Sequence, residues 1–223
     1  MKHQETLTAT FKELAESFAQ LVEGEGIIIR PYADPKLIHF NRLSPDEQVD
    51  VISRVKTYVL AFVHMKEKHQ PLTDTRAQVE TYLNTAGYNS RPEDLDLIEN
   101  DHFIEIYNRA GMHLFRSLNI LEISSYTFED LCCRQWHHLY ERPGDEQEKI
   151  ILAAAQYFQL ENPVRQETGL KPFRIIEKDS LERLIYNAET KWFIPVFKAD
   201  SFAAVLTIVV NRNKNPIPQY FHP

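Results

Sequence analysis

Apolar and polar positions follow two different periods along this chain, and the period changes near Asn100. Before this point, apolar residues recur every three or four positions, which is typical of amphipathic helices. After it, short apolar runs bounded by turn-forming residues predominate around residues 103–117 and again from 173 to 210, which is typical of strands. The pattern predicts an α+β fold, in which an antiparallel sheet carries helices on one face and follows a mainly helical N-terminal region.

The last third of the chain is predicted to form an antiparallel meander. Its apolar-rich runs are Phe173 to Glu177, Leu181 to Asn187, Thr190 to Ala199 and Phe202 to Val210, and turn-forming residues divide them. The last two runs are apolar at nearly every position, and a strand that is apolar on both sides is normally covered on both sides. Helices predicted between residues 119 and 160 cover only one face, so another segment is expected to cover the second.

The first predicted helix has an apolar seam with coiled-coil spacing. It ends at Gly24 and Gly26, and its seam consists of Leu7, Phe11, Leu14, Phe18 and Leu21. The seam is expected either to dock on its own chain or to pair with a second copy. We expect this helix to cover the second face of the sheet, in competition with an apolar stripe from Val51 to Val63, and we predict a homodimer whose interface includes it.

Short-range signals predict where the other N-terminal helices begin and end. Ser44-Pro45-Asp46-Glu47 is a capping box, and the helix that it starts is expected to stop before Pro71. Thr73 or Asp74 is expected to cap a third helix that ends at Gly87. Ser90-Arg91-Pro92-Glu93 repeats the capping-box pattern. Before these helices, Gly26 to Arg30 and Lys36 to Phe40 are expected to form a short hairpin or two extended connectors.

A hairpin and two helices are predicted in the middle of the chain. Phe103 to Tyr107 and Met112 to Ser117 flank the turn-forming group Asn108-Arg109-Ala110-Gly111. Thr127-Phe128-Glu129-Asp130 has the pattern of a helix start, and this helix is expected to continue through Trp136 and Tyr140 to Pro143. Asp145 is expected to cap the next helix, Glu146 to Leu160.

The order of these elements resembles that of a PAS-type sensory domain. The stretch Ile104-Glu105-Ile106-Tyr107-Asn108-Arg109-Ala110-Gly111 stands where such domains often carry an apolar strand ending in Asn, and the resemblance covers about Asp101 to Arg212. The family pattern has five strands and this chain has six candidate runs, so a GAF-like sensor fold is the alternative. The resemblance implies a small ligand between sheet and short helices, dimerisation through flanking helices and a downstream signalling protein. It divides the chain into a mainly helical region (1–99), a PAS-like domain (101–212) and a C-terminal tail (213–223).

Composition and charge restrict the partners. A formal charge of −7 without a long Lys/Arg block argues against nucleic acid. The longest apolar run, Phe202 to Val210, is far shorter than the roughly 20 residues of a membrane helix, and the N-terminus lacks a signal-peptide pattern. Cys132 and Cys133 are sequence neighbours and do not form a disulfide framework, which agrees with a reducing compartment. We therefore expect a cytoplasmic protein without nucleic-acid or membrane partners.

Cys133 and His137 are the candidate metal ligands. Four residues apart on one predicted helix, they would face the same way, and a thiolate with an imidazole suits zinc or haem iron. No second Cys/His pair with ligand spacing accompanies them, so we predict that they hold no metal. A Cys–His nucleophile pair would also need an orienting acid, and the sequence shows none.

Glu105 and Arg116 are the candidate polar anchors of a ligand pocket. If the hairpin closes around Arg109-Ala110, they become diagonal neighbours in an apolar setting, either as a cross-strand salt bridge or as part of a binding site. The aromatic candidates for lining such a pocket are Tyr126, Trp136, Phe173 and Trp192. The acidic residues between Asp94 and Asp101 are expected to form a solvated face, because they lack the pattern of a calcium loop.

The sequence is compatible with two functions. The first is a sensory or regulatory domain that binds a small molecule between sheet and helices and signals through helix packing or dimerisation. The alternative is a ligand-free adaptor that binds another protein through the apolar outer face of the sheet and through the helices. The sequence contains no catalytic constellation, so we do not expect an enzyme, and it identifies no particular cofactor.

Overall fold

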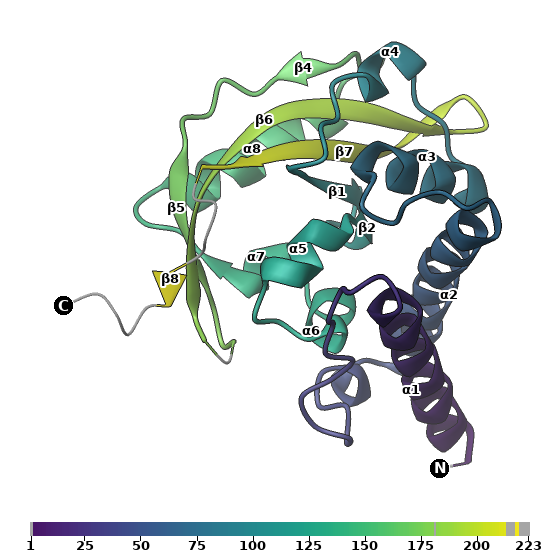
Figure 1. The fold of residues 1–223 in the computed structure, drawn as a ribbon. Helices are drawn as coiled ribbons and strands as arrows, with labels where there is room; N and C mark the ends of the chain where they lie inside the picture. Colours follow the sequence, from purple (N-terminus) through teal and green to yellow (C-terminus); the bar gives the residue numbers. More distant parts are fainter. Residues whose placement is uncertain (1, 181, 213–216, 219–223) are drawn as a thin grey trace.

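The computed structural model describes residues 2–180, 182–212 and 217–218. It confirms the predicted α+β fold: a helical N-terminal region precedes a curled antiparallel sheet (Figure 1). Leu181, the predicted first residue of a strand, lies outside the described residues. So does the predicted tail, 213–223, except for the short strand β8 (Ile217–Pro218).

The N-terminal helices are α1 (Lys2–Glu23), α2 (Pro45–Glu67), α3 (Thr75–Ala86) and α4 (Pro92–Leu95). Among these N-terminal helices, α2 and α3 begin at predicted capping residues. Both halves of the Ser44 capping box are present, Asp74 caps α3, and Gly87 ends it at a φ of 69°, which glycine adopts without strain.

Two local predictions in this region are wrong. Ser90 does not cap α4, since its hydroxyl donates to the carbonyl of Pro195 on the sheet (3.0 Å) and Arg91 occupies the N-cap position without a side-chain bond. The two segments after α1 form no hairpin. Residues 27–30 are an irregular connector, and residues 36–40 turn into a short 3-10 helix, η1 (Phe40–Arg42).

The main strands are β1 (His102–Asn108), β2 (His113–Arg116), β5 (Phe173–Glu177), β6 (Leu184–Lys198) and β7 (Ser201–Asn211). Their spatial order is β2-β1-β7-β6-β5, all antiparallel, and β3 (Tyr140–Glu141) continues it beside β5. The two-residue strands β4 (Gln166–Glu167) and β8 lie along β6. The predicted hairpin of β1 and β2 is confirmed.

The predicted turn at Ala188-Glu189 is wrong, because β6 runs through it. Ala188 pairs with Phe173 of β5 on one side and with Asn211 of β7 on the other, so neighbours on both sides hold this backbone extended. A bulge between Thr190 and Trp192 accommodates the irregularity. Two predicted runs are therefore one long strand.

Four helices connect β2 to β5: α5 (Leu118–Ile123), α6 (Phe128–Cys133), α7 (Trp136–Leu139) and α8 (Glu146–Phe158). The predicted continuous helix from Thr127 to Tyr140 is wrong, because the chain is extended at Arg134 (φ −108°, ψ 145°) between α6 and α7. The Arg134 guanidinium holds this break by bonding the carbonyls of His138 and Lys178. Asp145 stands at the N-cap of α8 but makes no capping bond.

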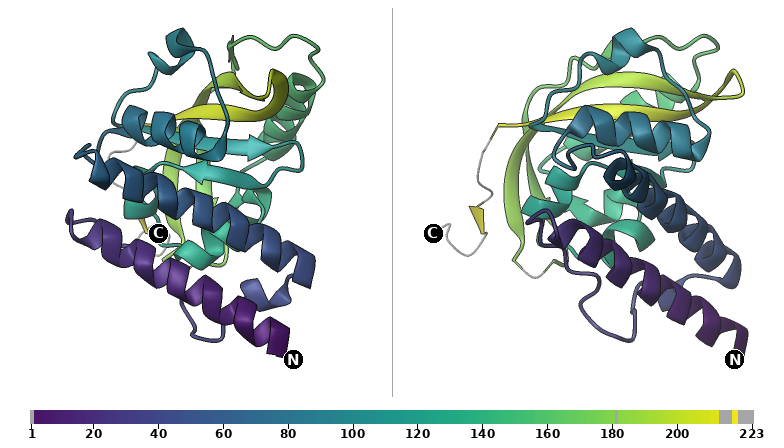
Figure 2. Two further views of the ribbon diagram at one scale, coloured as in Figure 1. Left: turned by 90° about the vertical axis from the view of Figure 1, so that its right-hand side faces the viewer. Right: turned by 45° about the vertical axis from the view of Figure 1, so that its right-hand side comes forward.

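Helices cover both faces of the sheet (Figure 2). Helices α5, α7 and α8 lie on one side, here called the inner face, and α2 and α3 pack on the outer face. The outer-face side chains Ile104, Ile194 and Leu206 are fully buried in the same core as α2 and α3. The competitor of α1, the Val51–Val63 stripe, therefore covers the sheet together with α3, and the prediction that α1 does so is wrong.

Helix α1 packs on α2 as an outer layer (Figure 2). Its seam residues Phe11 and Phe18 are fully buried within their own chain. The ring of Phe18 lies 4.8 Å from that of Phe128 and 5.1 Å from that of Tyr58, so an aromatic cluster from α2 and α6 takes up the seam. Among the described helices, none combines the length and the apolar character needed to cross a membrane.

Candidate ligand-binding site

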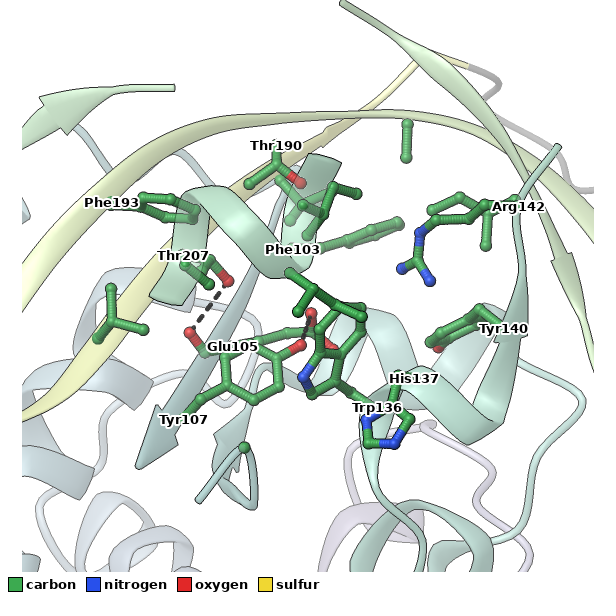
Figure 3. Close-up of a pocket in the computed structure, with 18 of the residues that line it drawn as sticks. Phe103, Glu105, Tyr107, Trp136, His137, Tyr140, Arg142, Thr190, Phe193 and Thr207 are labelled. Atoms are coloured by element: carbon green, nitrogen blue, oxygen red, sulfur yellow. Dashed lines mark hydrogen bonds between the residues drawn. The ribbon is translucent and has the colours of Figure 1, made fainter. Parts of the chain in front are cut away.

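A cavity of about 350 Å³ lies between the inner face of the sheet and helices α5, α7 and α8 (Figure 3). This volume is in the range of small-molecule sites, roughly 300–1,000 Å³. Its wall is mostly apolar. The aromatic residues of the wall are Phe103, Tyr107, Trp136, Tyr140, Phe158, Phe173, Tyr186 and Phe193.

Strand alternation builds the floor of the cavity. On β1, Phe103, Glu105 and Tyr107 face the cavity, whereas Ile104 and Ile106 between them face the outer core. On β7, residues 205, 207 and 209 face the cavity in the same way. These outer positions of β1 and residues 204, 206 and 208 of β7 are apolar, whereas the inner positions mix apolar and polar groups, so polar groups collect at the cavity.

Glu105 is the largely buried charge of the floor. Its carboxylate meets Arg116 Nε at 3.0 Å and His113 Nε2 at 3.3 Å. The Tyr107 hydroxyl donates to the same carboxylate (Figure 3). Burial by itself would raise the pKa of Glu105, but the positive charge of Arg116 and the hydrogen bonds from His113 and Tyr107 lower it to about 2. Glu105 and Arg116 are direct cross-strand partners and not the predicted diagonal ones, because the register shift between Ile106 and Tyr107 moves the pairing.

His113 is neutral in this network. Burial, and next the charge of Arg116, lower the pKa of His113 to about 3. Arg116 Nη2 contacts both ring nitrogens, Nε2 and Nδ1 (3.1 Å to Nδ1), and Nε2 also lies 3.3 Å from the Glu105 carboxylate. The four side chains Glu105, Tyr107, His113 and Arg116 are called the Glu105 network below.

Helix α2 is bonded to the strand that carries this network. The Tyr58 hydroxyl donates to the carbonyl of Arg116 and Arg54 Nη1 donates to the carbonyl of His113, both at 2.7 Å. A second cavity of about 30 Å³ lies beside Arg54 and Arg116, and it has room for about one water. Strand β2 thus connects the cavity floor to α2.

Arg142 is the second charge in the cavity wall (Figure 3), and Arg109, on the exposed turn between β1 and β2, is the third among the described wall residues. The Arg142 guanidinium lies over the rings of Trp136 (5.1 Å), Tyr140 (5.6 Å) and Phe173 (5.7 Å). Nη1 donates to Gln147 Oε1 at 2.6 Å, whereas the buried Nε has no hydrogen-bond partner. Burial lowers the pKa of Arg142.

The structure brings three of the six predicted site residues to the cavity wall: Glu105, Trp136 and Phe173. Arg116 lies behind Glu105 and lines the small cavity instead. Tyr126 is buried away from the cavity, with its hydroxyl among the carbonyls of Leu139 and Lys178. Trp192 packs against the outer core, because the bulge between Thr190 and Trp192 shifts the alternation of β6, so that Thr190 and Phe193 face the cavity and Trp192 does not.

Arg142 and Tyr140 are wall residues that sequence reasoning missed. Tyr140 belonged to a predicted helix stripe, and Arg142 follows it in a segment with no periodic pattern. Only the pairing of β3 with β5 places Arg142 near Phe173, and no sequence signal marks that pairing. For Tyr107, in contrast, the alternation of β1 was a sufficient signal.

The predicted Cys133–His137 pair is separated by the break at Arg134. Cys133 is buried in the outer core on α6, and burial raises the pKa of its thiol, which disfavours the reactive thiolate. His137 lines the cavity on α7, where burial lowers its pKa. That the pair holds no metal stays a prediction.

The acidic residues near Asn100 differ from the predicted solvated face at one position. Asp94 is buried, only 3% exposed, with Arg165 Nη1 at 3.6 Å. Within the described ranges, Glu99, Asp101 and His102 bring metal-competent atoms within 4.8 Å of one another. Two of these are exposed acids, which are common without an ion, so the group does not by itself indicate a metal site.

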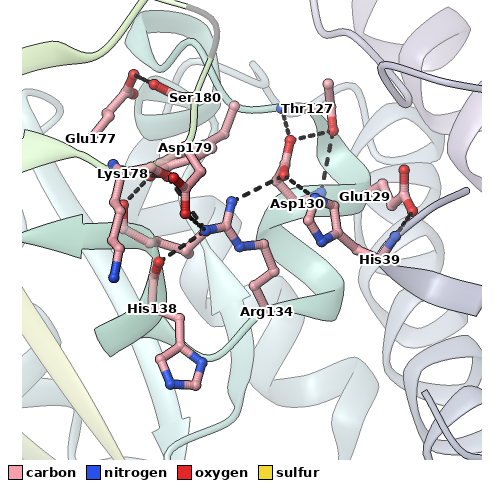
Figure 4. A network of polar contacts seen from close by, with 12 residues as sticks. His39, Thr127, Glu129, Asp130, Arg134, His138, Glu177, Lys178, Asp179 and Ser180 are labelled. Carbon is pink, nitrogen blue, oxygen red and sulfur yellow. Dashed lines mark hydrogen bonds and ion pairs between the residues drawn. The ribbon is translucent and has the colours of Figure 1, made fainter. Parts of the chain in front are cut away.

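A polar network around α6 connects this helix to neighbouring segments of the chain (Figure 4). Asp130 accepts hydrogen bonds from Thr127 in a capping box and pairs with His39 Nε2 (3.1 Å) and Arg134 Nη1 (3.3 Å). Burial alone would raise the pKa of Asp130, but the bonds from His39 and Thr127 lower it to about 2. The network positions the break between α6 and α7, and hence the wall residues of α7.

Acid is expected to destabilise the fold through His113. The ordinary pKa of 6.5 applies to the unfolded chain and the folded pKa is about 3, so the unfolded state binds a proton first as the pH falls. His113 should therefore lower the free energy of unfolding by about 2 kcal/mol between about pH 8 and about pH 5. The charged and titratable groups that face the ring are Arg116, Glu105, Arg54 and Tyr107.

Urea unfolding at the two pH values measures this effect. His113→Gln keeps an amide donor near Glu105 but cannot titrate, so its stability should fall less over the same pH range. His138→Gln, at an exposed position, is the control and should behave as the wild type. A wild-type stability that is the same at both pH values would contradict the expectation.

No protein-family model matches this chain, and no curated protein matches it either. The cavity, the Glu105 network and the bonds to α2 are therefore the basis for inferring a function.

Proposed function

We propose that this protein is a sensory or regulatory protein that binds a small molecule in the cavity between the sheet and helices α5, α7 and α8. The observation that carries the proposal is the cavity itself: about 350 Å³, mostly apolar, with a few convergent polar groups. Because β6 combines two of the six predicted runs, five of the described strands are longer than two residues. The PAS pattern also has five strands. A PAS-like sensory domain is thus our proposal for the family type.

Strand β2 offers a route from ligand to helix packing. A ligand that contacts Glu105 or Tyr107 alters the side chains bonded to His113 and Arg116, and the carbonyls of these two residues accept hydrogen bonds from Arg54 and Tyr58 of α2. A ligand shifts this packing only as far as its affinity differs between the two arrangements. We propose that α2, with α1 packed on it, passes the signal to a downstream protein in the cytoplasm.

The alternative, a ligand-free adaptor, loses one of the two surfaces on which it was based. The outer sheet face that an adaptor would offer to a partner is covered by α2 and α3 of the same chain. A homodimer stays part of the proposal, but Phe11 and Phe18 are buried in the monomer and are not available for its interface. The proposed activity is binding, without catalysis.

Filling the cavity should abolish binding of an apolar probe. Ala154 lies on α8 and faces the cavity, so Ala154→Trp places an indole in it. We expect the affinity for the neutral dye Nile red, measured by fluorescence titration, to fall at least about tenfold, because the substituted side chain occupies the apolar volume that the dye would fill. Gln156→Trp adds the same group at an exposed position of the same helix and should leave the affinity unchanged.

Native mass spectrometry of the purified protein provides an independent readout, because a retained metabolite adds a defined mass that Ala154→Trp should remove. Nile red binding that is equal in the wild type and both variants would show that the dye does not enter the cavity. Absence of any binding to the folded wild type would overturn the proposed function.

A further inference from the structure

Arg142 is a cation in the cavity wall that pairs with no carboxylate in the described part of the chain. None of the ion pairs there includes it, and its buried Nε has no hydrogen-bond partner. Among the described residues, Gln147 is the one hydrogen-bond partner of the Arg142 guanidinium. The Nε2 atom of Gln147 is also buried without a partner. Two donors are thus left unsatisfied side by side, which is costly in an apolar setting.

Glu105, the one carboxylate among the described wall residues, is not available to Arg142. Its oxygens are already engaged by Arg116, His113 and Tyr107. The pKa values keep the remaining titratable wall groups neutral at pH 7, since burial raises those of Tyr107 and Tyr140 and lowers that of His137. The Glu105–Arg116 pair cancels, and Arg109 lies on the exposed turn between β1 and β2, so the buried part of the wall carries one excess positive charge, on Arg142.

The aromatic rings around Arg142 fix where this charge lies. Three ring faces, those of Trp136, Tyr140 and Phe173, contact the guanidinium at 5.1 to 5.7 Å. Such rings would also suit a cationic ligand, but the guanidinium already occupies them and would repel a second cation. An anion, in contrast, gains both the charge and the unpartnered Nε donor.

We propose that the ligand of the cavity is a small apolar molecule with a single carboxylate, which binds the guanidinium of Arg142 while its apolar body lies against the wall around Phe103 and Phe193. The inference rests on the proposed function and names the ligand class for that site. One carboxylate matches the single excess charge of the buried wall. A phosphate dianion would bring a second negative charge to the apolar part of the cavity, where Arg142 is the one unpaired cation among the described residues, and this is unfavourable.

Calorimetric titration with octanoate, octanol and octylamine tests the class, because the three probes share a chain and differ in charge. For the wild-type protein we expect octanoate to bind roughly ten- to a hundredfold more tightly than octanol, the range of a charge-assisted hydrogen bond, and octylamine to bind more weakly than either.

Variants assign the preference to Arg142. In Arg142→Met, octanoate should lose its advantage over octanol while octanol binding persists. Arg142→Lys keeps the charge without the planar fork and should retain part of the preference. Arg174→Met removes a cation at an exposed position of β5, next to Phe173 but on the other side of the strand, and should leave the preference intact.

Equal affinity of the wild type for octanoate and octanol would overturn the carboxylate proposal, and so would a preference that survives in Arg142→Met. The wild-type comparison needs no variant and therefore holds even if a substitution impairs folding. If the three probes bind equally well and Ala154→Trp blocks their binding, the carboxylate proposal is wrong and the proposed binding function is still supported. If neither these probes nor Nile red binds, both the carboxylate proposal and the proposed function are wrong.

Discussion

Arg116→Met is expected to lower the free energy of unfolding by about 3–5 kcal/mol, the cost of breaking a buried ion pair from one side. Arg116 is buried and the Glu105 side chain is only 15% exposed, with their charged atoms 3.0 Å apart. Without the guanidinium, the Glu105 carboxylate keeps only His113 and Tyr107 as partners. Equilibrium unfolding in urea, monitored by circular dichroism, measures the loss.

The double variant Glu105→Gln/Arg116→Met is the matched control. It removes the carboxylate charge together with its partner, so it should be more stable than Arg116→Met alone. If Arg116→Met stays within about 1 kcal/mol of the wild type, the pair is solvated like a surface salt bridge, and the interpretation of the Glu105 network as a buried charge network is wrong.

Phe18→Ala is expected to cost a similar amount, about 3–5 kcal/mol, as is typical of a buried phenylalanine. The ring is fully buried and contacts Tyr58, Phe62 and Phe128, with ring centres at 5.1, 5.5 and 4.8 Å. Because these contacts lie within one chain, the loss should not depend on protein concentration. Leu14→Ala, at a partly buried seam position, should cost less.

The same variant separates the two interpretations of the α1 seam. Stability of a dimer held together by α1 would rise with protein concentration in the wild type, and Phe18→Ala would abolish that dependence. Urea unfolding at two protein concentrations, together with light scattering, distinguishes these outcomes. A concentration-dependent loss would restore the dimer seam.

Element type followed from the sequence where the deciding signals are local. The Ser44 capping box, the Asp74 cap and the αL glycine at position 87 act over three or four residues, and all three are as predicted. Local signals failed where a distant segment supplies a partner. Ser90 bonds Pro195 instead of capping α4, and neighbouring strands on both sides keep Ala188 extended.

In the candidate site, too, local signals predicted some features and contacts between distant segments decided others. Alternation along β1 was enough to place Glu105 on one face with Tyr107, because side chains of a strand alternate whatever lies around it. It was not enough to pair Glu105 with Arg116 directly, since that depends on a bulge in the hairpin. Trp192 was misplaced for the same reason, by the bulge in β6.

The sequence by itself determined the α+β class, the order of the elements and the apolar faces, because periodicity and caps depend on residues a few positions apart. Only the tertiary structure decided that α2 and α3 cover the outer face, that α1 packs on α2, and that Arg142 lies unpaired beside Phe173 in the cavity wall. These contacts join segments distant in the chain. Several apolar stripes have similar hydrophobicity and compete for the same faces, so the choice among them depends on the shape and packing of the whole core.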